Sequence, residues 1–414
     1  MYSISVLAGG CPNGCWPPYG SQALRSSTLR TALHELDPFV RPPVLLGEHA
    51  SGDQLGWLAG STAGEVILAP AVAGQIIVPD PVPDSAEATL LRMIGGYRVT
   101  QALYVVTKLG IPDLLSDGPK YAEELATRVG ARPDFLYRVL RALASIGVLT
   151  VDGDARFGLT EVGRLLRNNP EGSMGLTAVF AGEEAYRSWG DLLHSIKTGE
   201  TAFDHRYGMG HFEYLSRNPD ASLTFNRLMA WSARVAGEPL RTYDLGSHQL
   251  LVDVGGGSGA LIASVLRAHP GLRGVLFDQE AAVVDAPNLL ATSGVADRCE
   301  IVTGSAFDSI PPGGDVYVMS RVLHDWPDDK ALVLLTNCRK SMSPGGVLLL
   351  VEGVLPEVAA PPPRLWLDLV MMVMTGGRER TETDWRNLLG KAGFALVSVR
   401  PDRPNQDLIE ARAI

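Results

Sequence analysis

The segment that decides the fold is LLVDVGGGSGA, residues 250–260. Its apolar start, LLVDV, is typical of a short buried strand. The glycines that follow permit a tight turn with positive φ, and they let backbone N–H groups approach a ligand at the start of the helix expected near Leu261. The segment therefore predicts a strand, a ligand-binding loop and a helix in succession.

The chain after this segment alternates in the same way. Further apolar runs, separated by segments with helical periodicity, lie at Gly274–Phe277, Glu300–Val302, Asp315–Ser320 and Gly346–Val351. Two more runs, 394–399 and 407–411, lie close together and predict a terminal antiparallel pair. The alternation predicts an α/β fold with a Rossmann-like, doubly wound parallel sheet, which binds ligands at the carboxyl ends of its strands.

The glycine loop fits two classes of cofactor. Residues 255–260 satisfy the G-x-G-x-x-A dinucleotide fingerprint, whereas residues 253–259 fit the D-x-G-x-G-x-G pattern of S-adenosylmethionine binding equally well. Asp278 ends the second expected strand and could hold a ribose hydroxyl in either class. A purely structural turn is the third interpretation.

Three polar residues lie at the ends of expected strands. Asp278 ends the second strand, His324 follows the fourth, and Glu352 ends the fifth. Because parallel strands end at one rim of the sheet, we expect a ribose anchor and a general base to face the same crevice.

The chain before the sheet divides into three parts. Residues 1–84 are rich in Gly, Pro, Ser and Ala without sustained periodicity, and we expect a poorly ordered leader. Residues 85–168 predict two successive helices, 121–129 and one after Pro133, followed by a hairpin over 148–159, which is a winged-helix pattern. We expect it to serve packing or dimerisation, because its basic residues are not clustered as in a DNA-binding surface. Residues 169–244 continue as a helical, pocket-forming linker, and 245–414 hold the sheet.

Composition excludes several classes of protein. Subtracting 46 acidic from 36 basic residues gives a net charge of −10, which disfavours binding to nucleic acid or to an anionic membrane. Four cysteines are too few for a disulfide framework, and no apolar run is long enough to span a bilayer. Because a basic secretory start is also lacking, we expect a cytoplasmic protein.

From about Leu90 to the C-terminus the sequence resembles the metal-independent small-molecule O-methyltransferases, which include plant caffeate-type enzymes and bacterial enzymes that tailor polyketides and antibiotics. Five motifs carry the resemblance: DVGGGSG at 253–259, GSAF at 304–307, LHDWPDD at 323–329, SPGG at 343–346 and GGRERT at 376–381. The resemblance implies a class I methyltransferase sheet, an N-terminal dimerisation domain that contains a winged helix, a homodimer, and S-adenosyl-L-methionine as the cofactor.

The resemblance also implies roles for individual residues. His324 matches the general base that takes the proton from a substrate hydroxyl, and Glu352 and Glu379 match the two acids beside the imidazole. The implied cofactor contacts are Gly255 and Gly257 at the methionine part, Asp278 at the ribose, Ser305, Ala306 and Phe307 at the adenine, and Ser320. The implied substrate contacts are Met229, Asp325 and Met371, and no metal ion is implied.

One cofactor position departs from the pattern of the resemblance. The family commonly has an acid where this chain has Ser305, so a hydroxyl replaces the carboxylate expected at the adenine amino group. The catalytic positions are not affected. Met and aromatic residues expected around the pocket favour a flat substrate, either aromatic or of polyketide type.

The residues leave the chemistry partly open. Proton transfer from a phenol to an ordinary imidazole is uphill by about 5 kcal/mol, so we expect Glu352 or Glu379 to stabilise the imidazolium. Either acid could instead be an ordinary surface acid, and Glu379 could simply pair with Arg378 or Arg380. The alternatives to methyl transfer are hydroxylation by a protein that binds S-adenosylmethionine, an NAD-dependent oxidoreductase, and a winged-helix ligand-sensing regulator.

Overall fold

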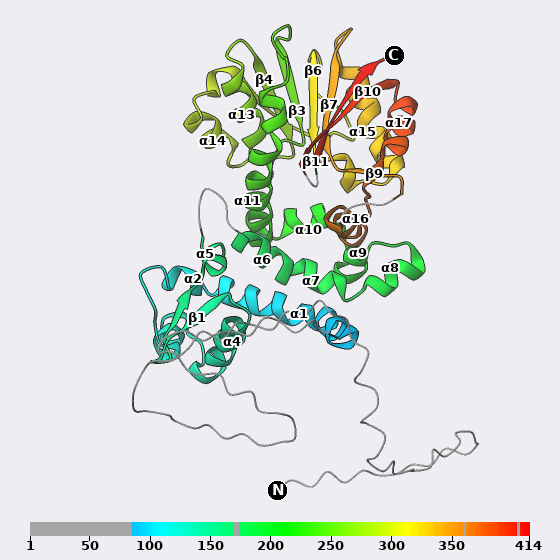
Figure 1. Cartoon of the computed structure of the whole chain (residues 1–414). Coiled ribbons are helices and arrows are strands. Elements are labelled where there is room, and N and C mark those ends of the chain that lie inside the picture. The colour runs from blue at the N-terminus through cyan, green and yellow to red at the C-terminus, as the bar shows by residue number, and fades with distance from the viewer. Residues whose placement is uncertain (1–84, 169–173, 359–361, 404–405) are drawn as a thin grey trace, which may run out of the picture. The chain divides into compact units, whose positions relative to one another are not determined.

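The structure is a computed structural model that describes residues 85–168, 174–358, 362–403 and 406–414. The predicted leader, residues 1–84, lies outside the described residues, so it stays a prediction. Elements are labelled as in Figure 1. No helix in the described ranges combines the length and apolar character needed to cross a bilayer.

The first described part of the chain is mainly helical. Its elements are α1 (Ala86–Lys108), α2 (Ile111–Leu114), α3 (Ala122–Val129), α4 (Pro133–Ser145), β1 (Leu149–Val151), β2 (Phe157–Leu159) and α5 (Glu161–Arg164). In α4 the apolar residues Leu136, Leu140 and Leu143 recur at helical spacing and are buried in one core. Strands β1 and β2 pair antiparallel. The predicted helices and hairpin are therefore confirmed, while the description of this unit as a winged helix stays a prediction.

A layer of shorter helices follows. It consists of α6 (Met174–Gly182), α7 (Glu184–Trp189), α8 (Leu192–Thr198), α9 (Ala202–Tyr207), α10 (His211–Arg217), α11 (Pro219–Ala236) and α12 (Glu238–Arg241). The fully buried Phe203 of α9 packs in a small core with Val373 and Met374 from the later helix α16 (Pro362–Met374). The domain boundaries expected near 168 and 244 fall between α5 and α6, and after α12.

The rest of the chain forms a seven-stranded mixed sheet with the order β10-β11-β7-β6-β3-β4-β5. Its strands are β3 (Leu250–Val254), β4 (Arg273–Asp278), β5 (Cys299–Thr303), β6 (Val316–Ser320), β7 (Val347–Glu352), β10 (Phe394–Arg403) and β11 (Gln406–Ala413). Strands β5, β4, β3, β6 and β7 are parallel, whereas β11 runs antiparallel to both β7 and β10. The predicted parallel sheet and terminal antiparallel pair are confirmed, although both terminal strands are longer than predicted.

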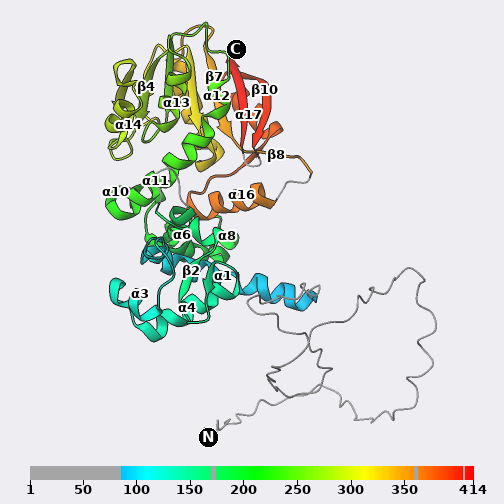
Figure 2. The same cartoon turned by 60° about the vertical axis from the view of Figure 1, so that its left-hand side comes forward.

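Helices cover both faces of the sheet (Figures 1 and 2). Successive residues of β3 face opposite sides: Leu251 joins the core under α13 (Ala260–Ala268) and α14 (Ala286–Thr292), whereas Val252 joins the other core. That second core lies under α15 (Asp328–Ser341) and α17 (Glu382–Lys391). Helix α11 packs against both α6 and α13, and so links the helical layer to the sheet.

Short elements complete the carboxyl edge of the sheet. They are the 3-10 helix η2 (Leu323–Asp325) and the parallel two-stranded pair β8 (Val354–Leu355) and β9 (Arg380–Thr381). A further 3-10 helix, η1 (Ala296–Arg298), directly precedes β5 and lies at its amino end. Because the parallel strands end at this edge, the residues at their ends, Asp278, Ser320 and Glu352, converge there.

Candidate active site

A cavity lies at the carboxyl edge of the sheet, bordered by residues of α10 and α11. It is lined by nine of the residues predicted from the sequence: Gly255, Gly257, Asp278, Ser305, Ala306, Phe307, Ser320, Met229 and Asp325. His324, Glu352, Glu379 and Met371 do not line it. All four are buried, and His324 directly precedes the lining residue Asp325.

The glycine loop and Asp278 form one hydrogen-bonded unit. Gly255 has φ of +73°, and a Cβ built there would lie 2.6 Å from a methyl carbon of Val322, so only glycine fits. The N–H of Gly257 donates to Oδ2 of Asp278 at 2.8 Å, and the N–H of Gln279 donates to Oδ1 at 2.7 Å. Asp278 therefore fixes the shape of the loop as well as lining the cavity.

Two carboxylates lie beside this loop, the buried Asp253 and the partly buried Asp278. Burial raises the pKa of Asp278, although the hydrogen bonds from the N–H groups of Gln279 and Gly257 oppose the shift. Burial, together with the nearby Asp278 charge, raises the pKa of Asp253 to about 7. The Oδ2 atom of Asp253 has no hydrogen-bond partner within the described part of the chain.

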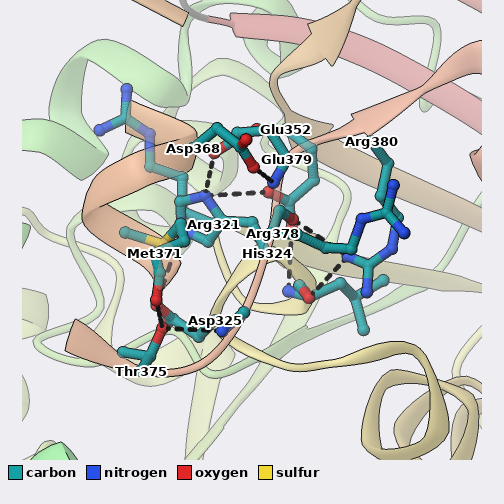
Figure 3. Close-up of polar contacts among 12 residues, drawn as sticks. Arg321, His324, Asp325, Glu352, Asp368, Met371, Thr375, Arg378, Glu379 and Arg380 are labelled. Atoms are coloured by element: carbon teal, nitrogen blue, oxygen red, sulfur yellow. Dashed lines mark hydrogen bonds and ion pairs between the residues drawn. The ribbon is translucent and has the colours of Figure 1, made fainter. Parts of the chain in front are cut away.

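The imidazole of His324 is surrounded by acids (Figure 3). Its Nδ1 lies 2.7 Å from Oε1 of Glu379 and 3.8 Å from Oε2 of Glu352. Its Nε2 lies 4.0 Å from Oδ1 of Asp325, which lines the cavity. The exposed fractions are only 6% for His324, 1% for Glu352 and 2% for Glu379. Both glutamates therefore lie nearest to Nδ1, whereas Nε2 faces Asp325.

Burial and charge compete in this cluster. Burial lowers the pKa of His324, but the charge of Glu352 and the hydrogen bond to Glu379 outweigh it and raise the pKa to about 9. Burial also raises the pKa of Glu352 to about 7, against the opposing effect of His324. The acids beside the ring therefore stabilise the imidazolium form of His324.

Backbone contacts hold the loop that carries His324. The guanidinium of the fully buried Arg380 donates to the carbonyl oxygens of Leu323 at 2.9 Å and Trp326 at 2.8 Å. The N–H of Arg378 donates to the carbonyl oxygen of His324 at 2.9 Å. These bonds tie both sides of His324 to the segment that contains Glu379.

The interpretation of Glu379 as a surface acid paired with a neighbouring arginine is wrong. Arg378 pairs with Asp384 at 3.1 Å, and Arg380 pairs with Asp328 at 2.9 Å. Glu379 is buried, and its Oε1 contacts Nδ1 of the His324 imidazole. The arginines therefore position the segment and leave the Glu379 carboxylate to His324.

Gly377 lies against the backbone of the same loop, and we expect Gly377→Ala to lower kcat at least about tenfold and to destabilise the protein by about 1–3 kcal/mol. A Cβ there would lie 1.9 Å from the carbonyl oxygen of His324, so the loop must shift. Steady-state kinetics and thermal unfolding measure the two effects. Gly390→Ala is the control, since a Cβ at Gly390 in α17 meets nothing within 4 Å. Equal kinetics for both variants would contradict the close fit.

Two residues of the site, and the role of Arg380, were not predicted from the sequence. Arg321 lines the cavity, and its guanidinium donates to the Ser232 hydroxyl. It is a non-glycine residue with φ of +54°, which no sequence pattern signals. Asp368 of α16 accepts the N–H of Glu379 at 2.8 Å through Oδ1. Only the packing of α16 against this segment places that carboxylate there.

Comparisons with known proteins agree with this geometry. The family described as O-methyltransferase domain matches residues 189–395, and the family described as O-methyltransferase dimerisation domain matches residues 91–169. The second match supports the predicted homodimer.

Individual relatives cover most of the chain. The phenazine O-methyltransferase PhzM of Lysobacter antibioticus is 45% identical over 326 residues, which are 78% of this chain and 96% of that protein. The 8-amino-8-demethylriboflavin N,N-dimethyltransferase of Streptomyces davaonensis is 36% identical over 76% of this chain and 92% of that protein.

A solved structure shows a relative with ligands bound. The O-methyltransferase NcsB1 from neocarzinostatin biosynthesis, in complex with S-adenosylmethionine and 2-hydroxy-5-methyl naphthoic acid, is 33% identical and has a TM-score of 0.71. The match covers 78% of this chain and 98% of that one. S-adenosylmethionine is therefore confirmed as the cofactor, in preference to a dinucleotide. This chain belongs to the O-methyltransferase family and is an S-adenosylmethionine-dependent methyltransferase with that family's dimerisation domain.

Proposed function

We propose that the enzyme methylates a hydroxyl group of an aromatic or polyketide-type small molecule, with His324 as the general base. The observation that carries this proposal is the buried imidazole whose Nδ1 is bound by Glu379, which leaves Nε2 toward the cavity-lining Asp325. A general base needs a free ring nitrogen near the acceptor and a partner that stabilises the protonated ring.

The lining of the cavity suits S-adenosylmethionine. The Asp278 carboxylate would hold the ribose, the backbone of Gly255 and Gly257 would face the methionine part, and Ser320 would add a contact. Ser305, Ala306 and Phe307 would lie against the adenine. We add Arg321, whose partly buried cation lines the cavity and would pair with the carboxylate of the cofactor. When bound, S-adenosylmethionine supplies an electrophilic methyl group on a positively charged sulfur.

The cluster around His324 suits proton removal from a weak acid. A phenol has a pKa of about 10, and the neighbouring acids raise the pKa of His324 to about 9, so moving the proton to the imidazole is only slightly uphill. With an ordinary imidazole the same step would be uphill by about 5 kcal/mol. Glu352 and Glu379 would stabilise the imidazolium as it forms, while Met229 and Met371 would flank the acceptor.

The acceptor side of the proposal has a direct test. The enzyme is incubated with S-adenosylmethionine labelled in its methyl group and with matched hydroxy and amino forms of phenazine, benzoate and naphthoate rings. We expect label on oxygen of at least one hydroxy form. Label on the amino forms alone would overturn the hydroxyl assignment and favour the N-methylation named for the riboflavin-type relative. A product that has gained oxygen without label would favour hydroxylation.

The raised pKa of His324 predicts the pH dependence of the reaction. At pH 7 only about 1% of a group with a pKa of about 9 is neutral, so kcat/KM for the acceptor should rise with pH, reach half of its plateau near pH 9 and level off above that pH. Glu379→Gln removes one cause of the raised pKa, so the rise should move to lower pH by about one unit or more. The plateau should also fall about tenfold, because the imidazolium is less stabilised.

Profiles of kcat/KM against pH at saturating S-adenosylmethionine measure both changes. Glu382→Gln is the matched control, because this exposed residue pairs with Arg386 and does not contact His324. An unmoved rise in the Glu379→Gln profile would contradict the proposed role of Glu379.

A further inference from the structure

The connection between α8 and α9 brings two imidazoles and a carboxylate together outside the cavity. His194 lies on α8, Glu200 lies in the connection, and His205 lies on α9. One ligand atom from each of the three lies within 4.8 Å of the others, and the described ranges contain no other such group. Nε2 of His194 lies 2.8 Å from Oε2 of Glu200. The two imidazole rings stack with centroids 3.7 Å apart and planes 13° apart.

The backbone that carries these groups is already ordered. The Thr198 hydroxyl donates to the carbonyl oxygen of His194 at 2.9 Å, and the N–H of Glu200 donates to the same hydroxyl at 3.1 Å. Phe203, two residues before His205, is fully buried and anchors α9. A ligand at this place therefore finds its donors close together, and binding needs little ordering of the chain.

The donor set selects a class of ligand. Two imidazole nitrogens and one carboxylate oxygen suit Zn²⁺, Co²⁺, Ni²⁺ or Cu²⁺, whereas Mg²⁺ and Ca²⁺ prefer oxygen ligands alone. Three protein ligands leave room for water to complete the coordination. The side chains of His194 and Glu200 are 24% and 70% exposed, so an ion can enter from solvent.

We propose that His194, Glu200 and His205 bind one divalent ion of the Zn²⁺ and Co²⁺ class, which links α8 to α9. The ion takes no part in methyl transfer, because none of the three residues lines the cavity. Both helices pack against α16, so the ion stabilises the helical layer beside the acceptor part of the site.

Co²⁺ titration of the untagged full chain, stripped with EDTA, tests the proposal. We expect one equivalent to bind with the visible absorption of nitrogen and oxygen ligands, without the charge-transfer band that cysteine thiolates produce. His194→Ala and Glu200→Gln should each weaken this binding at least about tenfold. His248→Ala is the matched control, since His248 lies 3.9 Å from Asp315 in a separate part of the chain.

Thermal unfolding provides the second measurement. Zn²⁺ should raise the Tm of the wild-type protein by about 2–4 °C and leave that of His194→Ala unchanged. The stripped enzyme should keep its methyl transfer activity, which separates this proposal from the proposed function. Full Co²⁺ binding by a His194→Ala/His205→Ala double variant, or an unchanged wild-type Tm in Zn²⁺, would overturn it.

Discussion

Replacing His324 with alanine should lower kcat by about 10²- to 10⁴-fold and leave the Kd for S-adenosylmethionine nearly unchanged. The reason is that different residues bind the cofactor and deprotonate the acceptor. The imidazole does not line the cavity that Asp278 and the glycine loop form, but its Nε2 is on the side of Asp325, where the acceptor would be deprotonated. Steady-state kinetics and calorimetric titration with S-adenosylmethionine measure the two quantities separately.

A second variant separates the loss of the base from a loss of protein stability. His324→Ala leaves two buried carboxylates, Glu352 and Glu379, without their partner, which can destabilise the protein. His324→Gln keeps a polar group near Glu379 but cannot serve as a base at neutral pH, so it should lose a similar factor in kcat. Wild-type turnover in either variant, with normal cofactor binding, would remove His324 from the mechanism.

The second large effect concerns the cofactor. Asp278→Ala should raise the Kd for S-adenosylmethionine by about 100-fold, equivalent to about 2.7 kcal/mol. The substitution removes the carboxylate proposed to bind the ribose hydroxyls. It also removes the acceptor for the N–H groups of Gly257 and Gln279, so the loop loses the bonds that fix its shape.

Two further variants make the Asp278 experiment specific. Asp278→Asn keeps one oxygen acceptor and should fall between wild type and Asp278→Ala. Asp285→Ala is the control, since Asp285 precedes α14 without a capping hydrogen bond and does not line the cavity. A Kd for Asp278→Ala within about threefold of wild type would show that the ribose is held elsewhere.

The parts of the site that the sequence predicted are those governed by local patterns. The apolar run and glycine loop at 250–260 predict a strand, a turn and a helix, and parallel strands must then bring Asp278, His324 and Glu352 to one edge. The pairing of Glu379 with His324 was expected from the family resemblance, because the two residues are far apart in the sequence.

The parts that were missed depend on packing between distant segments. Arg321 adopts its positive φ where β6 passes into η2, and its backbone N–H bonds to the carbonyl oxygen of Val351 in β7. In the sequence, Arg380 belongs to an ordinary polar motif. In the structure its side chain is buried and donates to the carbonyl oxygens of Leu323 in η2 and of Trp326, which follows η2. Asp368 contacts the Glu379 backbone only because α16 lies beside it. None of these contacts leaves a periodic signal in the sequence.

The hydrogen bonds from Arg378 and Arg380 to the backbone of the His324 loop affect how such an enzyme can evolve. The loop and acid that face the cofactor come from one stretch of chain, whereas the imidazole is held by a later stretch continuous with α16. Mutations that remodel α16 can thus alter which molecule is accepted while the cofactor-binding stretch stays unchanged, provided that the Arg380 guanidinium still binds the carbonyl oxygens of Leu323 and Trp326.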